Sequence, residues 1–299
     1  MSLPIEIIIN AGSGSVQQDE TTRILTDLFE QNNVKANINL AKNGGEIIQL
    51  AKRLAKSETE IIVAGGGDGT ISAVASELIN INKTLGILPL GTLNNFSKDL
   101  RIPQDLEDAV KIIAENFTKQ IDVGEVNGRK FVNNSSIGFY PRIVRQREKQ
   151  QLKGRSKWNA AFWATLKIFH VSPFLKVKLD IDNKQFLRKT PFVFVGNNEY
   201  EMDFFNIGRR KCLDDGKLSV YFLHRGGRTG LFMLAFRLLT GRLRQGKDFE
   251  EVRTEEITIQ MQKKRILAAF DGEIAVLQTP LHYKILPKVL RVIVPKEHI

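Results

Sequence analysis

Cysteine is nearly absent from this sequence: Cys212 is the single one among 299 residues. One cysteine cannot form an intramolecular disulfide, so a disulfide-based fold is excluded and a reducing compartment is favoured. No apolar run reaches the roughly 18–20 residues that cross a bilayer. The N-terminal stretch MSLPIEIIIN also lacks a basic segment followed by an apolar one. We therefore expect a cytoplasmic protein with neither a signal peptide nor a membrane-spanning helix.

Acidic residues are scarce in two stretches of the second half of the chain. Residues 142–167 carry eight lysines and arginines against one acid, Glu148, and residues 225–247 carry six with no acid. Together with a net charge of +11, these stretches indicate nucleic acid, an acidic lipid surface or a phosphate-bearing ligand, or only a solvated charged face. Because no nucleic-acid-binding motif accompanies the charge, we do not expect nucleic acid as the partner.

Aromatic residues lie within the basic stretches. We expect helices at 156–170 and 229–243, and the first has Trp158, Phe162 and Trp163 at helical spacing. Basic helices with Trp and Phe are typical of proteins that bind an anionic membrane surface, where each nearby Lys or Arg contributes about 1 kcal/mol. Packing in a protein core would use the same aromatic residues, so both alternatives stay open.

Strand-like and helix-like patterns alternate over the first 125 residues. Apolar runs predict strands at 5–9, 36–40, 61–64 and 85–88. Helices are expected at 21–32, 45–56, 70–80 and 106–116. This alternation predicts a parallel sheet covered by helices on both faces, with ligands bound in the loops at the carboxyl ends of its strands.

Short alternating strands replace this pattern beyond about residue 125. The dipeptides Asn127-Gly128 and Asp182-Asn183 predict tight hairpin turns between such strands. We therefore expect a second, antiparallel domain with a sandwich-like or barrel-like architecture. The closing segment at 287–299 could return to either domain.

Glycine is concentrated where the predicted strands end. NAGSGS follows the first strand at 10–15, GGGDGT follows the third at 65–70, and PLGTLNN follows the fourth at 89–95. Glycine costs about 0.5–1 kcal/mol relative to alanine in regular structure, so such a cluster indicates that the backbone approaches something closely. The three loops should meet at one edge of the sheet and form a site.

The GGGDGT stretch suits phosphate binding. It matches neither the P-loop nor the three-glycine dinucleotide fingerprint. Its bare N–H groups and the N-terminus of the helix that Thr70 opens would attract phosphate oxygens. Asp68 would repel a phosphate, so we expect it at a metal-bound water or a sugar hydroxyl. A tight strand-to-helix turn with incidental glycines is the alternative, which the number of such residues disfavours.

Four motifs in order resemble the diacylglycerol kinase catalytic-domain family, which contains bacterial soluble lipid kinases and the sphingosine kinases. They are GGGDGT, PLGTLNNFS at 89–97, DDGKL at 214–218 and FDGE at 270–273. The resemblance covers essentially the whole chain. It implies an α/β, parallel-sheet, NAD kinase-like ATP-binding domain at 1–125 and an antiparallel β-sandwich domain at 126–286 that binds lipid and metal. The active site would lie in the cleft between them.

The resemblance also implies which residues bind the cofactors ATP and Mg²⁺. For ATP they are Asn10, Gly65, Gly66, Gly67, Asp68, Gly69, Thr70, Gly91, Thr92 and Asn94. For Mg²⁺ the family site corresponds to CLDDGKL, in which Asp215 would supply a carboxylate and Cys212 and Lys217 would supply backbone carbonyls. Such an all-oxygen set suits Mg²⁺, and the Cys212 sulfur is not implicated.

The FDGE motif carries the implied catalytic acid, Glu273, with Asp271 as a second carboxylate. A carboxylate near an apolar strand can have its pKa raised toward neutrality, which suits a general base. A hairpin turn is the alternative reading of FDGE, because Asp-Gly is a common turn dipeptide. Asp122 in IDVGEV resembles an aspartate of the family's interdomain network, or is simply a polar residue at a strand end.

Three positions depart from the family pattern. Ala11 follows Asn10 where the family usually has proline, Ala41 stands where relatives often have threonine, and Asn95 stands where the family usually has aspartate. The loss of a charge at Asn95 could alter metal or nucleotide contacts.

The sequence thus predicts an ATP- and Mg²⁺-dependent lipid kinase, peripherally associated with an anionic membrane surface, that acts on a diacylglycerol-like or sphingoid-like hydroxyl. Two alternatives remain: a non-catalytic nucleotide- and lipid-binding protein, and a kinase of a soluble dinucleotide. The sequence does not name the lipid, and a homodimer stays open.

Overall fold

A computed structural model of the protein describes residues 4–11, 15–139, 141, 174–181, 184–200, 210–223 and 249–298. The chain forms two compact units, Met1–Val123 with Pro287–Ile299, and Gly124–Leu286. Two strands, β5 (Thr118–Val126) and β16 (Leu281–Ile293), contribute residues to both units.

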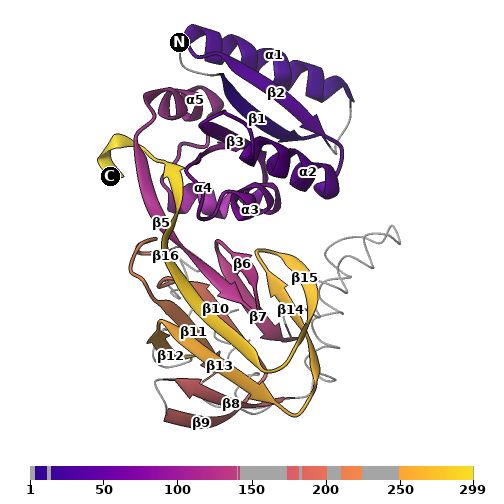
Figure 1. The fold of residues 1–299 in the computed structure, drawn as a ribbon, viewed down its shortest axis with the longest axis vertical. Coiled ribbons are helices and arrows are strands. Elements are labelled where there is room, and N and C mark those ends of the chain that lie inside the picture. Colours follow the sequence, from indigo (N-terminus) through magenta and orange to yellow (C-terminus); the bar gives the residue numbers. More distant parts are fainter. Residues whose placement is uncertain are drawn as a thin grey trace, which may run out of the picture. The chain divides into compact units, whose positions relative to one another are not determined.

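Strands and helices alternate along the first unit (Figure 1). In chain order they are β1 (Ile5–Asn10), α1 (Ser15–Gln31), β2 (Ala36–Ala41), α2 (Gly44–Ala55), β3 (Ile61–Gly66), α3 (Asp68–Glu77), β4 (Thr84–Pro89), α4 (Asn95–Asp99), α5 (Leu106–Glu115) and, at the end of the chain, the 3₁₀ helix η1 (Lys296–His298). The strand order is β2-β1-β3-β4-β16, and all four pairings are parallel. Helices α1 and α5 pack together, and α2 packs against α3 on the other side of the sheet (Figure 1).

The central strands are buried because they are apolar on both faces. Every residue of β4 is buried, and β1 buries Ile7, Ile8 and Ile9. Continuous apolar runs of this kind are typical of strands with helices on both sides. The predicted parallel sheet is confirmed, with strand ends that differ by at most two residues from those predicted.

Helix α3 ends at Glu77, three residues before its predicted end, and two other helices differ more. Helix α1 begins at Ser15, whereas the sequence predicted a start at residue 21. The prediction missed the first turns because they consist largely of polar residues and show no apolar stripe. Helix α4 was not predicted at all, since a helix of five residues is too short to show a periodic pattern.

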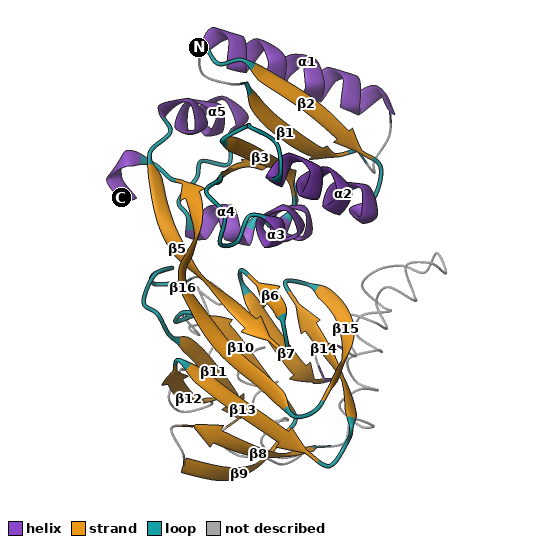
Figure 2. Cartoon of the chain, viewed as in Figure 1, coloured by secondary structure: helices purple, strands orange, loops and turns teal. Residues whose placement is uncertain are grey.

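Strands predominate in the described part of the second unit (Figure 2). One sheet contains β8 (Leu175–Ile181), β9 (Lys184–Thr190) and β13 (Glu256–Met261) together with β5, β6 (Arg129–Phe131) and β16. The other has the order β12-β11-β10-β7-β14-β15. Its strands are β7 (Asn134–Gly138), β10 (Phe192–Asn197), β11 (Leu218–Leu223), β12 (Phe249–Thr254), β14 (Arg265–Phe270) and β15 (Glu273–Gln278).

The two sheets of this unit share one apolar core. In β8, Val177 and Leu179 point inward while Lys176 is exposed, and the inward residues join Val220 and Tyr283 in one cluster. This alternation is what a sheet with one buried face requires. The predicted antiparallel architecture is confirmed.

The predicted hairpin at Asn127-Gly128 is confirmed. Val126 pairs with Arg129, and both turn residues have positive φ, +46° and +82°, as a type I′ turn requires. Strands β8 and β9 pair up to Ile181 and Lys184, but the Asp182-Asn183 turn itself lies outside the described residues.

The predicted basic helices at 156–170 and 229–243 also lie outside the described residues. Among the helices that the structure does describe, none combines the length and apolarity needed to cross a bilayer.

Candidate active site

The glycine loop lies at the carboxyl edge of the parallel sheet, between β3 and α3. Gly65 pairs with Leu88 and Gly66 with Pro89, which brings the loops after β3 and β4 side by side. Asn10 ends β1 next to them, and its Nδ2 lies 3.4 Å from the Thr70 Oγ1. The ends of β1, β3 and β4 therefore lie together, as the sequence predicted.

Two glycines allow the loops to touch. A Cβ placed on Gly91 would lie 2.3 Å from the Gly67 Cα and 2.6 Å from the Asn94 Oδ1. Real Cβ atoms do not approach other atoms so closely, so no larger residue fits at 91 unless the loops separate. At Gly69, by contrast, a Cβ would meet no atom of the described residues within 4 Å. Among these residues, the edge is tightly packed at Gly91 and open at Gly69.

The Asp68 carboxylate binds the N-terminus of α4. Its Oδ1 accepts the N–H of Phe96 at 2.9 Å, and its Oδ2 accepts the N–H of Asn95 at 3.2 Å. A carboxylate at this end of a helix is stabilising because it satisfies otherwise unpaired N–H groups. Asp68 therefore ties the glycine loop to the loop after β4, a contact that the sequence did not predict.

Within the part of the chain that the structure describes, no side chain caps the start of helix α3. Its N-cap residue is Gly67, whereas α2 and α5 are capped by the side chains of Asn43 and Asp105. The first N–H groups of an uncapped helix, with their partial positive charge, are available to an anion.

Asn94 supports the second loop from within. It is buried, its φ is +51°, and its Nδ2 donates to the Pro89 carbonyl and to the Gln104 Oε1, both at 3.1 Å. Its Oδ1 has no partner among the described residues. Thr92 is exposed beside it.

The structure describes the surroundings of the departures at 41 and 95. Ala41 is fully buried at the end of β2, where its carbonyl accepts the N–H of Ala11. Asn95 adds its Nδ2, 3.4 Å from the Asp68 Oδ2. An aspartate at 95 would instead place a second carboxylate against Asp68, so asparagine favours the cap.

In the second unit, Asp271-Gly272 forms the turn between β14 and β15. Both residues have positive φ, and Phe270 pairs with Glu273. The Asp271 carboxylate accepts three backbone N–H groups, those of Val132, Asn133 and Asn134, at 2.8 to 3.1 Å. The turn reading of FDGE is therefore confirmed, and Asp271 fixes that turn against the segment before β7.

Glu273 has very different surroundings. It is exposed at the first position of β15, and within the described part of the chain its carboxylate has no hydrogen-bond or ion-pair partner. It is accordingly available for chemistry, whereas Asp271 is engaged.

Asp122 is fully buried in β5. It accepts the N–H of Lys288, whose φ is +54°, at 2.9 Å. The side chain therefore supports the unusual backbone of β16 inside the first unit.

Two of the residues expected to hold Mg²⁺, Asp215 and Lys217, have protein partners in this structure. The Asp215 carboxylate forms an ion pair with Arg253, and the Lys217 carbonyl accepts the N–H of Asn198 at 3.1 Å. Burial, with the nearby Asp215 charge, raises the pKa of the Cys212 thiol. Among the described residues, no group of three or more His, Cys, Asp and Glu side chains could hold a metal ion.

The sequence did not predict the contact of Asp68 with Phe96 or the ion pair of Asp215 with Arg253, because each joins residues far apart in the chain. The first spans 28 positions and the second 38. The sequence did contain one indication of an ion-pair network at Arg253. In EEVRT, Arg253 lies two residues after Glu251, so a basic and an acidic side chain project from the same face of the strand.

Two family models match the chain. The model described as diacylglycerol kinase catalytic domain matches residues 4–126, and the model described as YegS C-terminal NAD kinase beta sandwich-like domain matches residues 136–294. The second match alone covers more than half of the 299 residues.

Similar proteins carry corresponding names. The diacylglycerol kinase of Bacillus subtilis is 26% identical over 297 residues, which are 97% of this chain and 96% of that protein. A probable lipid kinase YegS-like of Klebsiella pneumoniae is 32% identical over 146 residues, 48% of each chain. A crystal structure of a diacylglycerol kinase from Bacillus anthracis shares the fold, with a TM-score of 0.70 at 24% identity over 99% of this chain and 98% of that one.

The two family matches follow each other in the order that the four motifs predicted, and together they cover both structural units. The chain belongs to the diacylglycerol kinase catalytic-domain family of lipid kinases.

Proposed function

We propose that this protein transfers the γ-phosphate of ATP to a hydroxyl group of a membrane lipid. The observation that carries the proposal is the uncapped N-terminus of α3 at the open side of the glycine loop. The names of the relatives, diacylglycerol kinase and lipid kinase, support a lipid as the acceptor.

The phosphate-binding residues would be those of the first unit. The backbone N–H groups of Gly67, Gly69 and Thr70 suit phosphate oxygens, because none of them is shielded by a capping side chain. Gly65, Gly66, Gly91, Thr92, Asn94 and Asn10 would complete the wall around them.

Packing keeps this wall in place before any ligand binds. The Gly67–Gly91 contact and the Asp68 cap fix the two loops relative to each other. Groups fixed in advance bind a charged ligand without a further ordering cost, which is the physical reason for glycine at these positions. Asp68 would then act by positioning the loops rather than by touching the phosphates.

Glu273 is the proposed general base. When bound, ATP supplies the phosphoryl group, and a Mg²⁺ ion bound with it neutralises phosphate charge. Glu273 would accept the proton of the lipid hydroxyl. The hydroxyl oxygen would then bond to the γ-phosphorus, while the bond between that phosphorus and the β–γ bridging oxygen breaks. A base of this kind contributes typically 10²–10⁴-fold in rate. Asp271 holds the turn that presents Glu273.

We infer that the protein works at an anionic membrane surface, peripherally and from the cytoplasmic side. The two basic stretches of the sequence support this, since clustered lysine and arginine bind acidic lipids.

A soluble dinucleotide is the second candidate acceptor. The observation in its favour is that the matching sandwich model is described as NAD kinase-like. The basic stretches would have no evident purpose for such an acceptor.

Transfer of labelled phosphate from ATP tests the proposal, with diacylglycerol, a sphingoid base and a polyprenol in anionic vesicles and with NAD in solution. We expect label in a lipid product and none in NAD. Label in NAD alone would replace the proposal by the second candidate. ATP binding without any transfer would favour the non-catalytic alternative.

A further inference from the structure

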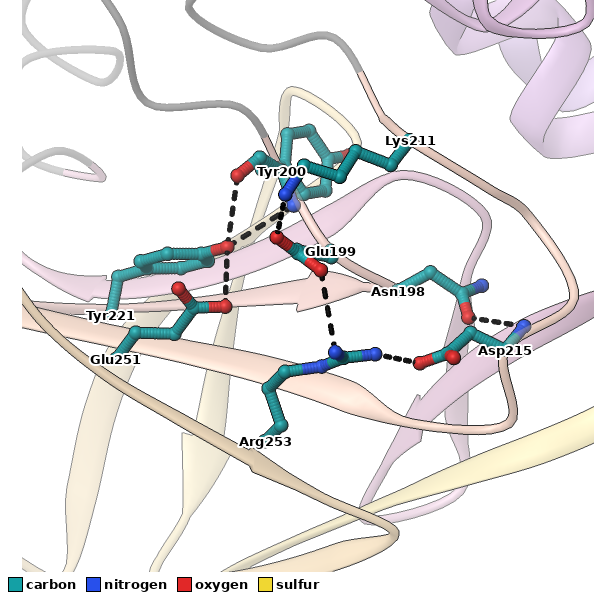
Figure 3. Close-up of polar contacts among 8 residues, drawn as sticks. All are labelled: Asn198, Glu199, Tyr200, Lys211, Asp215, Tyr221, Glu251 and Arg253. Atoms are coloured by element: carbon teal, nitrogen blue, oxygen red, sulfur yellow. Dashed lines mark hydrogen bonds and ion pairs between the residues drawn. The ribbon is translucent and has the colours of Figure 1, made fainter. Parts of the chain in front are cut away.

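The segment that resembles a metal site instead contains a network of protein charges (Figure 3). It joins the chain before β11 to β12 through the side chains of Asp215, Glu199 and Arg253, with Lys211 at one end. All of these residues lie within the second unit.

Arg253 bridges the two carboxylates. One guanidinium nitrogen pairs with the Asp215 Oδ2, and the other lies 3.3 Å from the Glu199 Oε2 (Figure 3). The Glu199 side chain is only 16% exposed, so its charge needs a partner inside the protein. A planar guanidinium can serve two carboxylates at once, which a lysine ammonium does less well.

Arg253 is surrounded by carboxylates. It pairs with Asp215 and Glu199, and the Glu251 charge also acts on it, while Glu199 pairs with Lys211 as well. A divalent ion at Asp215 would add two positive charges beside Arg253. Since like charges repel strongly where water is partly excluded, Mg²⁺ and Arg253 compete for one position.

Backbone contacts close the same loop without an ion. The Asn198 Oδ1 accepts the N–H of Asp215 at 3.0 Å, and the Asn198 N–H donates to the Lys217 carbonyl at 3.1 Å. Asn198 is fully buried, so it holds both ends of the 215–217 turn from the inside.

Arg253 is itself held in position. It pairs across the sheet with Ser219, and Glu251 on the same face of β12 pairs with Tyr221. The Tyr221 hydroxyl lies 3.1 Å from the Glu251 Oε1 and 3.0 Å from the Tyr200 carbonyl, which fixes the neighbouring chain (Figure 3). Burial raises the pKa of Tyr221, so this phenol stays neutral.

We propose that in this protein the Arg253 guanidinium takes the position of the structural metal ion, so that the 212–217 segment is stable without Mg²⁺. The segment is thereby stabilised by a cation that is covalently part of the chain, and its order does not vary with the free Mg²⁺ concentration.

The test is thermal unfolding of the nucleotide-free protein in Mg²⁺ chloride and in KCl of equal ionic strength. We expect the melting temperature of the wild type to be the same in both salts. Arg253→Gln should lower it by about 2–4 °C in KCl, because the Asp215 and Glu199 carboxylates lose the guanidinium that bridges them. Lys111→Gln is the surface control: it removes one charge and two ion pairs between exposed side chains, to Glu107 and Asp108, and should change little.

The proposal would be overturned if Mg²⁺ raised the melting temperature of the wild type but not that of Asp215→Asn. An Arg253→Gln loss no larger than that of Lys111→Gln would overturn it too. If Arg253→Gln does not fold, the comparison of the wild type with Asp215→Asn decides alone, and an equal response of both to Mg²⁺ supports the proposal.

Discussion

Two carboxylates of the FDGE turn differ in what surrounds them. Asp271 accepts three backbone N–H groups, and Glu273, two residues later, is exposed. The resemblance implied a catalytic part for both. Their surroundings differ accordingly: Asp271 holds the turn through its backbone contacts, and Glu273 is exposed, as the proposed role of a general base requires.

Asp271→Asn should reduce the free energy of unfolding by about 2 kcal/mol, because a neutral amide oxygen replaces a carboxylate that accepts three hydrogen bonds. Asparagine tolerates the positive φ at this position, so the backbone itself is not strained. Urea unfolding measures the change.

Glu273→Gln is the control for that variant, since a change at an exposed side chain, with no partner among the described residues, should alter stability by less than about 0.5 kcal/mol. Equal stability of Asp271→Asn and the wild type would show that the three hydrogen bonds do not hold the turn.

Strands and loops of the first unit were predictable because their signals are local. Apolar runs predicted the positions of β1, β3 and β4. Parallel pairing of these strands places Asn10, the glycine loop and the loop after β4 together. The same reasoning could not find α4, whose N-terminus is capped by Asp68 from a different loop. Helix α4 is recognisable only once the loops are neighbours.

The two sides of the glycine edge predict opposite effects of one methyl group. Gly91→Ala should lower the free energy of unfolding by about 1–3 kcal/mol, because its Cβ would overlap Gly67. Gly69→Ala meets open space in a helical position, so it should keep or slightly raise stability. If phosphates bind there, Gly69→Ala should nevertheless weaken ATP binding.

Urea unfolding and ATP titration calorimetry on both variants separate packing from binding. A Gly69→Ala variant that binds ATP as tightly as the wild type would argue against phosphate at the N-terminus of α3. A Gly91→Ala variant as stable as the wild type would argue against the close approach of the loops.

At the scale of the whole molecule, the order of motifs predicted the family and both architectures, because each motif marks a strand end or a turn. The ligand sets were less predictable. The DDGKL stretch resembles a metal site, yet in the folded protein the Asp215 carboxylate pairs with Arg253, 38 positions away in the chain. Charge balance depends on the folded neighbourhood, which a motif does not contain.

The most direct test of the account compares Glu273→Gln with the wild type in one preparation, measuring both the ATP dissociation constant and the turnover of lipid phosphorylation. The account predicts ATP affinity within about twofold of the wild type, because the proposed phosphate contacts all belong to the first unit. It predicts turnover reduced at least about 100-fold, the lower limit typical of a general base. Turnover equal to that of the wild type in Glu273→Gln would contradict it.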